Sequence, residues 1–198
     1  MYTFAFDPRL SNGSVSNIVL PATAEFTTED KPALLNGITV LRTEINKIEV
    51  VIHPQSIIHS MVQFVDGSIK AQMGHPDMRI PISYALTYPM RMKNNFQRLD
   101  FNKFNSLTFS EPDLNRFPCL RLAYDSLKSF GNSTTVLNAA NEIAVNGFLN
   151  NQISFNDISV LVETTLKNIN HINNPTIDDI INSNIDSRNF TTKLLNNN

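Results

Sequence analysis

Hydrophobic and polar residues alternate in three short stretches near the middle of the chain. Isoleucine and valine alternate with mostly polar positions along Lys47–Ile52, and the same period of two recurs in Ile58–Val65 and Ser68–Met73. This period places successive side chains on opposite faces of a β-strand. Asp66-Gly67 separates the last two stretches and is a strong hairpin signal, because both turn positions need positive φ. The pattern predicts a small, mostly antiparallel sheet with one face covered by helices.

Two weaker patterns follow the expected sheet. Ile82–Met90 suits a short helix, whereas Leu99–Phe109 looks extended. Leu107–Phe109 is a candidate for one more strand, because it joins a β-favouring threonine to apolar neighbours.

After residue 110 the apolar spacing changes to three and four, which is typical of amphipathic helices. Four such stretches with short links predict a small helical bundle. Gly131 is expected to end the first helix, because glycine is favoured just after a helix terminus. The expected helix starts are Pro112–Asn115, Ser133 or Thr134, Asn156 and Pro175. The predicted fold class is therefore α+β, with the sheet followed by a C-terminal four-helix bundle.

Residues 1–45 show no sustained period, and Pro8, Pro21 and Pro32 interrupt any regular element. Only Ala33–Ile45 suits a short helix or strand. The expected division of the chain is an irregular N-terminal segment (1–45), a sheet region (46–110) and the helical bundle (111–198).

Composition narrows the functional classes. A net charge of −2 and a pI near 6.1 give no electrostatic reason to expect nucleic acid or a membrane as partner. The single cysteine, Cys119, excludes a disulfide framework and a thiolate metal cluster, and it suits a small buried position better than a nucleophile. No apolar run reaches membrane-spanning length, and the N-terminus lacks a signal-peptide pattern. We expect a cytoplasmic protein, or one of a plastid-type organelle in a eukaryote.

Candidate chemistry lies around two proline turns at the ends of the expected strands, where side chains can reach a ligand. His59 shares a strand face with mixed residues, which fits either a substrate contact or a structural histidine. Ser56 fits a substrate hydrogen bond or a turn serine that bonds its own backbone, and His53 is expected to orient the Pro54 turn.

The same region resembles a known family through several ordered runs. They are Ile48–Val62, Asp66–Ser68, Ala71–Gly74, Pro76–Ile82, Leu107–Phe109, Phe117–Leu120 and Leu137–Glu142. From Lys47 onward the chain resembles 1-deoxy-D-xylulose 5-phosphate reductoisomerase, an NADPH-dependent oxidoreductase of non-mevalonate isoprenoid biosynthesis that uses Mg²⁺ or Mn²⁺. The family consists of a dinucleotide-binding domain, a catalytic domain and a helical bundle. This chain is similar to the end of the catalytic domain plus the bundle.

The resemblance implies roles for four residues. His59 and Ser56 would line the pocket of a phosphosugar substrate, while Met78 and Pro76 would form the turn beside the nicotinamide. Without the resemblance, a methionine after a turn fits core packing, and the ligand role of Met78 requires the missing domain. The resemblance also implies a homodimer formed through the sheet.

Two parts of the family pattern are absent from the sequence. No Gly-x-Gly-x-x-Gly run follows a strand, and no Asp-Ser-Glu run is present to bind a metal; Asp186-Ser187-Arg188 is a poor imitation. Residues 1–45 fit a diverged remnant, a frame-shifted start or a gene-fragment boundary.

Two functions from different classes stay open. The first is the reductoisomerase reaction, carried out by an incomplete chain that is expected to be inactive alone. The second is a non-catalytic fragment that acts as a dimerising interaction module, or a decayed gene product. No metal-ligand set can be assembled from the sequence.

Overall fold

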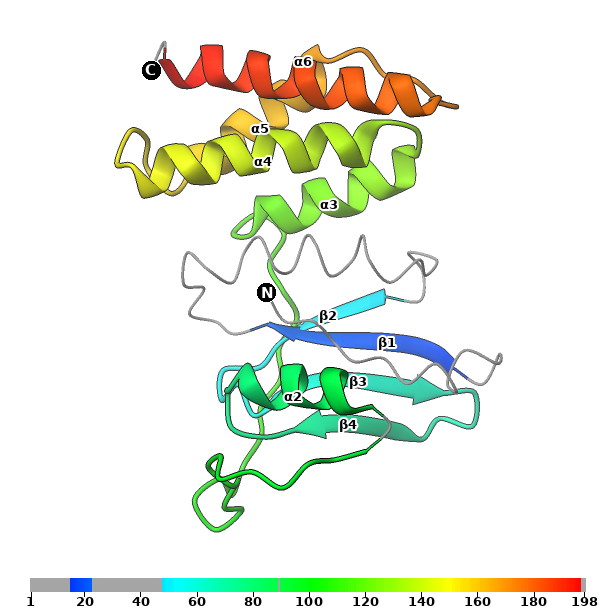
Figure 1. Cartoon of the computed structure of the whole chain (residues 1–198), viewed down its shortest axis with the longest axis vertical. Coiled ribbons are helices and arrows are strands. Elements are labelled where there is room, and N and C mark those ends of the chain that lie inside the picture. The colour runs from blue at the N-terminus through cyan, green and yellow to red at the C-terminus, as the bar shows by residue number, and fades with distance from the viewer. Residues whose placement is uncertain (1–14, 23–47, 89, 197–198) are drawn as a thin grey trace. The chain divides into compact units, whose positions relative to one another are not determined.

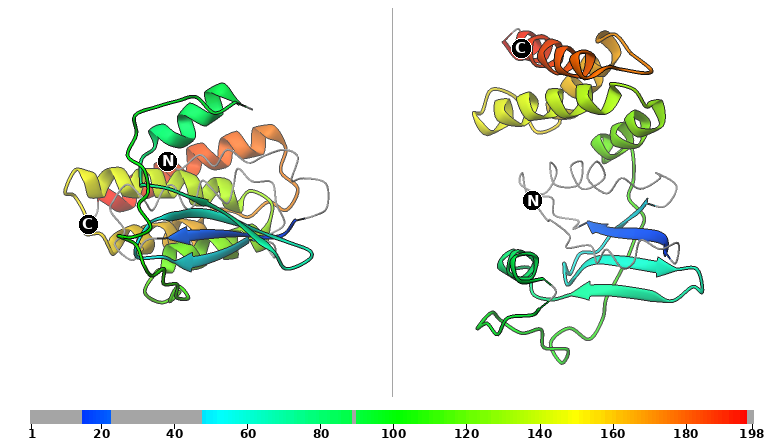
Figure 2. Two further views of the ribbon diagram at one scale, coloured as in Figure 1. Left: turned by 90° about the horizontal axis from the view of Figure 1, so that it is seen from below. Right: turned by 45° about the vertical axis from the view of Figure 1, so that its right-hand side comes forward.

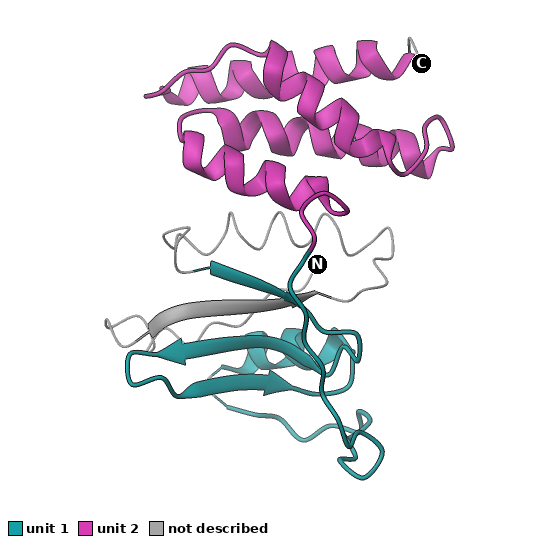
Figure 3. Cartoon of the chain, turned by 180° about the vertical axis from the view of Figure 1, so that it is seen from behind, with its two compact units in different colours: residues 1–112 teal, residues 113–198 magenta. Residues whose placement is uncertain are grey.

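The computed structural model describes residues 15–22, 48–88 and 90–196. Figure 1 shows its strands and helices in chain order, and Figure 3 colours two compact units, Met1–Pro112 and Asp113–Asn198. The first unit holds the sheet and the second holds the helical bundle.

Four strands form the sheet in the order β2-β1-β3-β4. Strand β1 pairs in parallel with β2 and antiparallel with β3, and β3 pairs antiparallel with β4. The strands are β1 (Val15–Ala22), β2 (Ile48–Ile52), β3 (Ile58–Phe64) and β4 (Ile69–Met73). The predicted α+β class, with a mostly antiparallel sheet followed by helices, is confirmed.

Residues 15–22 form strand β1, whereas the sequence predicted an irregular N-terminal segment here. The strand occupies the second position in the sheet and pairs on both sides, with Ile18 opposite both Ile48 and Val62. The register with β3 shifts between Val15 and Asn17. The candidate element at 33–45 lies outside the described residues.

The hairpin between β3 and β4 forms where Asp66-Gly67 predicted it. Gly67 has a φ of 84°, and the amide of Phe64 donates to the carbonyl of Ser68 at 2.9 Å. The Asp66 carboxylate accepts from the amide and hydroxyl of Ser68, which closes the turn. Burial differs from the pattern in β4, where Ile69 is 58% exposed, because this strand lies at the edge of the sheet.

Helix α2 (Arg79–Thr87) begins three residues before the predicted Ile82 start. The side chain of Asp77 accepts from the amide of Arg79 at 2.9 Å and so opens the helix. The expected extra strand is reduced to one bridge, in which Ile52 and Ser110 exchange backbone hydrogen bonds of 2.8 and 3.0 Å.

Four helices form the second unit (Figure 2). They are α3 (Pro118–Ser129), α4 (Ser133–Leu149), α5 (Asp157–Asn168) and α6 (Ile177–Asn196). The predicted first start was early, because the Asp113 side chain closes a turn with Asn115 and Pro118 takes the first helical position instead. The last helix is capped by Thr176, whose hydroxyl bonds the amide and carboxylate of Asp179.

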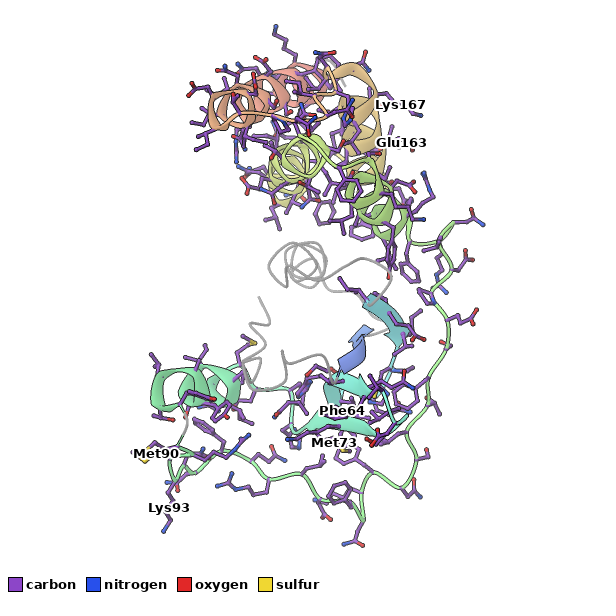
Figure 4. All side chains as sticks on the ribbon, turned by 90° about the vertical axis from the view of Figure 1, so that its right-hand side faces the viewer. Phe64, Met73, Met90, Lys93, Glu163 and Lys167 are labelled. Atoms are coloured by element: carbon purple, nitrogen blue, oxygen red, sulfur yellow. The ribbon has the colours of Figure 1, made fainter. Side chains whose placement is uncertain are left out.

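Small and apolar side chains close the bundle around α4, which packs against the other three helices. Ala140 and Ala144 of α4 are fully buried, and Leu161 of α5 is almost so. On the surface of α5, Glu163 and Lys167, labelled in Figure 4, form an ion pair at 3.0 Å. The bundle therefore has an apolar core of its own, with this ion pair on its surface.

Candidate functional site

Two turns of the sheet unit come together where β3 begins and β4 ends. Ile58 lies opposite Met73 in the antiparallel register, and the amide of Gly74 donates to the carbonyl of Ile57 at 3.0 Å. Met73, labelled in Figure 4, marks this end of the hairpin, and Phe64 marks the other. The pairing brings the first proline turn (residues 53–56), which precedes β3, close to the second proline turn (residues 74–78), which follows β4.

His59 is the central titratable group of this site. Its Nε2 lies 3.4 Å from the carbonyl oxygen of His75, so the ring donates a long hydrogen bond to the second turn. Partial burial lowers the pKa of His59, and hydrogen bonds from its ring to the backbone of His75 and Gly74 offset part of that effect. A small repulsion from His53 adds to the lowering of this pKa. His59 is therefore uncharged at neutral pH and can exchange hydrogen bonds with an oxygen-rich ligand.

Ser56 adopts a left-handed backbone conformation with a φ of 51°. This region costs a residue with a side chain about 1–2 kcal/mol. Its amide donates to the carbonyl of His53 at 3.1 Å, whereas its hydroxyl has no hydrogen-bond partner among the described residues. The turn thus presents a half-buried hydroxyl at the entrance to β3, and strain of this kind accumulates at functional sites.

Met78 and Pro76 occupy the second turn, directly before α2. Met78 is half-buried and Pro76 is exposed. A bidentate contact from Arg79 to Asp77, with nitrogen–oxygen distances of 2.7 to 3.1 Å, holds the two residues on either side of Met78. The side-chain hydrogen bond from Arg79 lowers the pKa of Asp77. The Arg79 guanidinium also lies 4.7 Å from the ring centre of Phe96.

The structure adds contacts that sequence reasoning missed. The side chain of Gln55 donates to the Thr108 hydroxyl at 2.8 Å and accepts from the Thr108 amide at 3.2 Å. His53 lies 2.9 Å from the Thr108 carbonyl and stacks on Phe109. These partners are more than 50 positions apart in the chain, and only the family run at residues 107–109 hinted at them.

Within residues 48–88 and 90–196, no three His, Cys, Asp or Glu side chains converge as a metal site would require. Oxygen-rich divalent-cation sites need several such ligands around one point, so the described side chains do not fit a metal-binding role.

In the same part of the chain, no helix combines the length and apolar character needed to cross a bilayer.

The sequence matches known proteins strongly. A model of the DXP reductoisomerase C-terminal domain covers residues 73–190. The 1-deoxy-D-xylulose 5-phosphate reductoisomerase of Phocaeicola vulgatus is 49% identical over 149 residues, which are 75% of this chain and 39% of that protein. The same enzyme of Ruminiclostridium cellulolyticum is 52% identical over 161 residues, or 78% of this chain and 42% of that protein.

Solved structures show the same similarity. The Zymomonas mobilis reductoisomerase in complex with NADPH aligns with a TM-score of 0.79 at 33% identity, covering 96% of this chain and 57% of that one. A DOX-P reductoisomerase in complex with NADPH, fosmidomycin and magnesium gives 0.80 at 28% identity, covering 92% and 56%. The chain spans about two fifths of the curated relatives it matches. Because the family model covers more than half of the sequence, the chain belongs to the DXP reductoisomerase family.

Proposed function

We propose that this chain contributes one wall of a 1-deoxy-D-xylulose 5-phosphate reductoisomerase active site. The reaction would isomerise deoxyxylulose phosphate and reduce the product with NADPH to methylerythritol phosphate, in isoprenoid biosynthesis. One observation carries the proposal: His59 and the 74–78 turn, which are far apart in sequence, meet at a distance of 3.4 Å. The family membership supports the same reaction.

His59 and Ser56 are the proposed substrate contacts. Burial keeps the His59 ring uncharged at neutral pH, so it would orient sugar oxygens through hydrogen bonds rather than by charge. Ser56 presents a hydroxyl from a turn whose backbone conformation is fixed. Groups held in place before the substrate binds lower the entropic cost of reaching the reactive geometry.

Pro76 and Met78 form the proposed nicotinamide-side surface. NADPH, when bound, supplies the hydride; the task of these two residues is to pack against the ring and exclude water. The Asp77–Arg79 pair holds the turn in shape for that contact. Because the described residues do not provide a metal-ligand set, Mg²⁺ or Mn²⁺ would need ligands from elsewhere, and we assign no step to a metal here.

The test is reconstitution in trans. The chain would be mixed with the region of the Ruminiclostridium cellulolyticum enzyme that precedes the part matched here, together with Mg²⁺, and deoxyxylulose phosphate-dependent NADPH oxidation would be followed. We expect activity in the mixture, none from either part alone, and a loss of at least about 100-fold with His59→Ala.

His171→Ala is the matched control, because this exposed histidine lies in the bundle unit. It should leave the rate of the mixture unchanged. An active mixture that tolerates His59→Ala would show that the proposed substrate contact is wrong.

A second candidate function is a homodimerising interaction module that requires no catalysis. The sheet unit favours it, because α2 contains no buried residue and Leu86 is 81% exposed. Exposed apolar groups of this size usually mark an interaction surface. For the reductoisomerase we likewise propose a cytoplasmic homodimer with no nucleic-acid or membrane partner. An active mixture would favour the enzyme, whereas a stable inactive dimer would favour the module.

A further inference from the structure

His53 is the most enclosed polar side chain described in the sheet unit. It directly follows β2 and has no exposed surface. Its Nδ1 lies 2.9 Å from the carbonyl oxygen of Thr108, and its ring stacks on Phe109 with centres 4.8 Å apart and planes inclined by 18°. A carbonyl oxygen can only accept, so Nδ1 carries the proton. The buried Nε2 has no hydrogen-bond partner among the described residues.

The backbone of His53 starts the strained turn. Its carbonyl accepts the amide of Ser56 at 3.1 Å, and Ser56 itself sits at a φ of 51°. A left-handed conformation at a non-glycine residue persists only when its surroundings enforce it. The contacts that hold this turn all go to residues 108–109, because Gln55 also forms hydrogen bonds with both the hydroxyl and the amide of Thr108.

We infer that His53 is a positioning residue of the candidate site: its Nδ1–H donated to Thr108 and its stack on Phe109 hold the 53–56 turn in the form that presents Ser56. The inference rests on the proposed function, because only a substrate contact gives the orientation of Ser56 a use. His53 touches no reacting atom in this arrangement and acts through the turn.

A residue that served only to fill the core would behave differently. Phenylalanine would keep an aromatic ring of slightly larger volume and the stack on Phe109, but it would leave the Thr108 carbonyl without its donor. Asparagine would lose the stack, but its Nδ2 is separated from Cβ by the same number of bonds as the histidine Nδ1 and can donate to the same carbonyl. His53→Phe and His53→Asn therefore separate packing from hydrogen bonding.

The test uses nuclear magnetic resonance on the whole chain. In the wild type, long-range proton–nitrogen correlation of the His53 ring should show a protonated Nδ1 and a bare Nε2. The amide shift and the amide–Hα coupling of Ser56 should report the left-handed turn. We expect His53→Asn to retain the Ser56 signature and His53→Phe to lose it, while the Ala140 amide in the bundle stays unchanged in both.

Two results would overturn the inference: a proton on Nε2 in the wild type, or a native Ser56 signature in His53→Phe. The wild-type ring measurement decides even if a variant does not fold. Titration with fosmidomycin, which the solved relatives bind together with magnesium, separates this inference from the proposed function when it is carried out on the mixture with Mg²⁺ and the preceding region of the Ruminiclostridium cellulolyticum enzyme. Shifts at Ser56 and His59 that disappear in His53→Phe support both. A correct ring proton and turn without any fosmidomycin response would leave the positioning role standing and remove the proposed substrate contact.

Discussion

The helical bundle and the sheet unit differ in how they treat apolar surface. Most of the buried apolar side chains described lie in the bundle, where Ala139, Ala140 and Ala144 have zero exposure, although Ile177 of the same unit is 80% exposed. The sheet unit leaves large apolar groups in solvent, among them Val65 at 72% and Leu86 at 81%. A unit with a large buried core can be stable alone, whereas a unit with few buried apolar side chains gains from a partner that covers its exposed ones.

The candidate chemistry follows the same division. The strained Ser56 and the pKa-shifted His59 both lie in the sheet unit. In the bundle, the hydrogen bonds between buried side chains, such as Thr165 to Thr191 at 2.9 Å, join helices and serve packing. The proposed substrate contacts and this buried packing network thus lie in different units.

The largest expected effect is that of Gly131→Ala in the bundle. Gly131 has a φ of 61°, and an added Cβ would lie 2.1 Å from the carbonyl oxygen of Ile172. Backbone strain and the clash together should lower the free energy of unfolding by about 4 kcal/mol. Gly67→Ala is the control: its φ is 84°, but no atom lies within 4 Å of the added Cβ, so about 1 kcal/mol is expected. Urea unfolding of both variants measures the two losses, and equal losses would contradict the clash.

The next largest difference in the free energy of unfolding is expected between a truncated core residue of the bundle and a truncated exposed residue of the sheet unit. Leu161→Ala removes a side chain that is 4% exposed and should destabilise the bundle by about 3 kcal/mol. Ile69→Ala removes one that is 58% exposed and should cost less than about 1 kcal/mol. Native-state hydrogen exchange read by mass spectrometry should show faster exchange in α5 for the first variant. If β3 lost as much protection as α5 in Leu161→Ala, the two units would not be energetically separate.

Self-association tests the exposed surface of the sheet unit. We expect the chain to form a dimer at tens of micromolar, and Val65→Lys should raise its dissociation constant about tenfold, because the contact would desolvate a charge. Val160→Lys is matched to it, since Val160 is a similarly exposed valine at 59% on the bundle, and should have no effect. Sedimentation equilibrium measures all three proteins. A monomeric wild type would exclude the interface.

The smallest expected effect is the pH dependence at His59. Its pKa is lower in the folded chain than the ordinary 6.5, so the unfolded chain binds the proton more readily. The stabilisation is fully present above pH 6.5 and is lost as the pH falls toward the folded pKa. The denaturation midpoint of the wild type should therefore fall more between pH 7.5 and 5.5 than that of His59→Asn. Identical pH profiles would contradict the burial of this ring.

Local sequence signals were sufficient for much of the fold. The period of two located β2, β3 and β4, and the period of three and four located all four bundle helices. Asp66-Gly67 identified the hairpin, although only Gly67 has the positive φ that the pattern predicted for both turn positions. Strand β1 was missed because its place between β2 and β3 depends on distant partners rather than on its own pattern.

The site was predictable only in part. Sequence indicated His59, Ser56, Pro76 and Met78, and the structure brings His59 next to the turn that holds the last two. The contacts of Thr108 were invisible because they join residues more than 50 positions apart, and the positive φ of Ser56 had no signal of its own, since it is not a glycine. Exposure of Ile69 was likewise unforeseen, since alternation does not reveal which strand lies at an edge.

The strand order has a consequence for folding speed. Strands β2 and β3 are consecutive in the chain but are separated in the sheet by β1, which precedes both. The β3–β4 hairpin can form locally, whereas β1 must find two partners that lie more than 20 residues further along the chain before the sheet is complete. Helices α3 to α6 follow one another with short links, so their contacts are mostly local. Low contact order favours fast folding, so the bundle, although it is synthesised last, should reach its native packing before the sheet does.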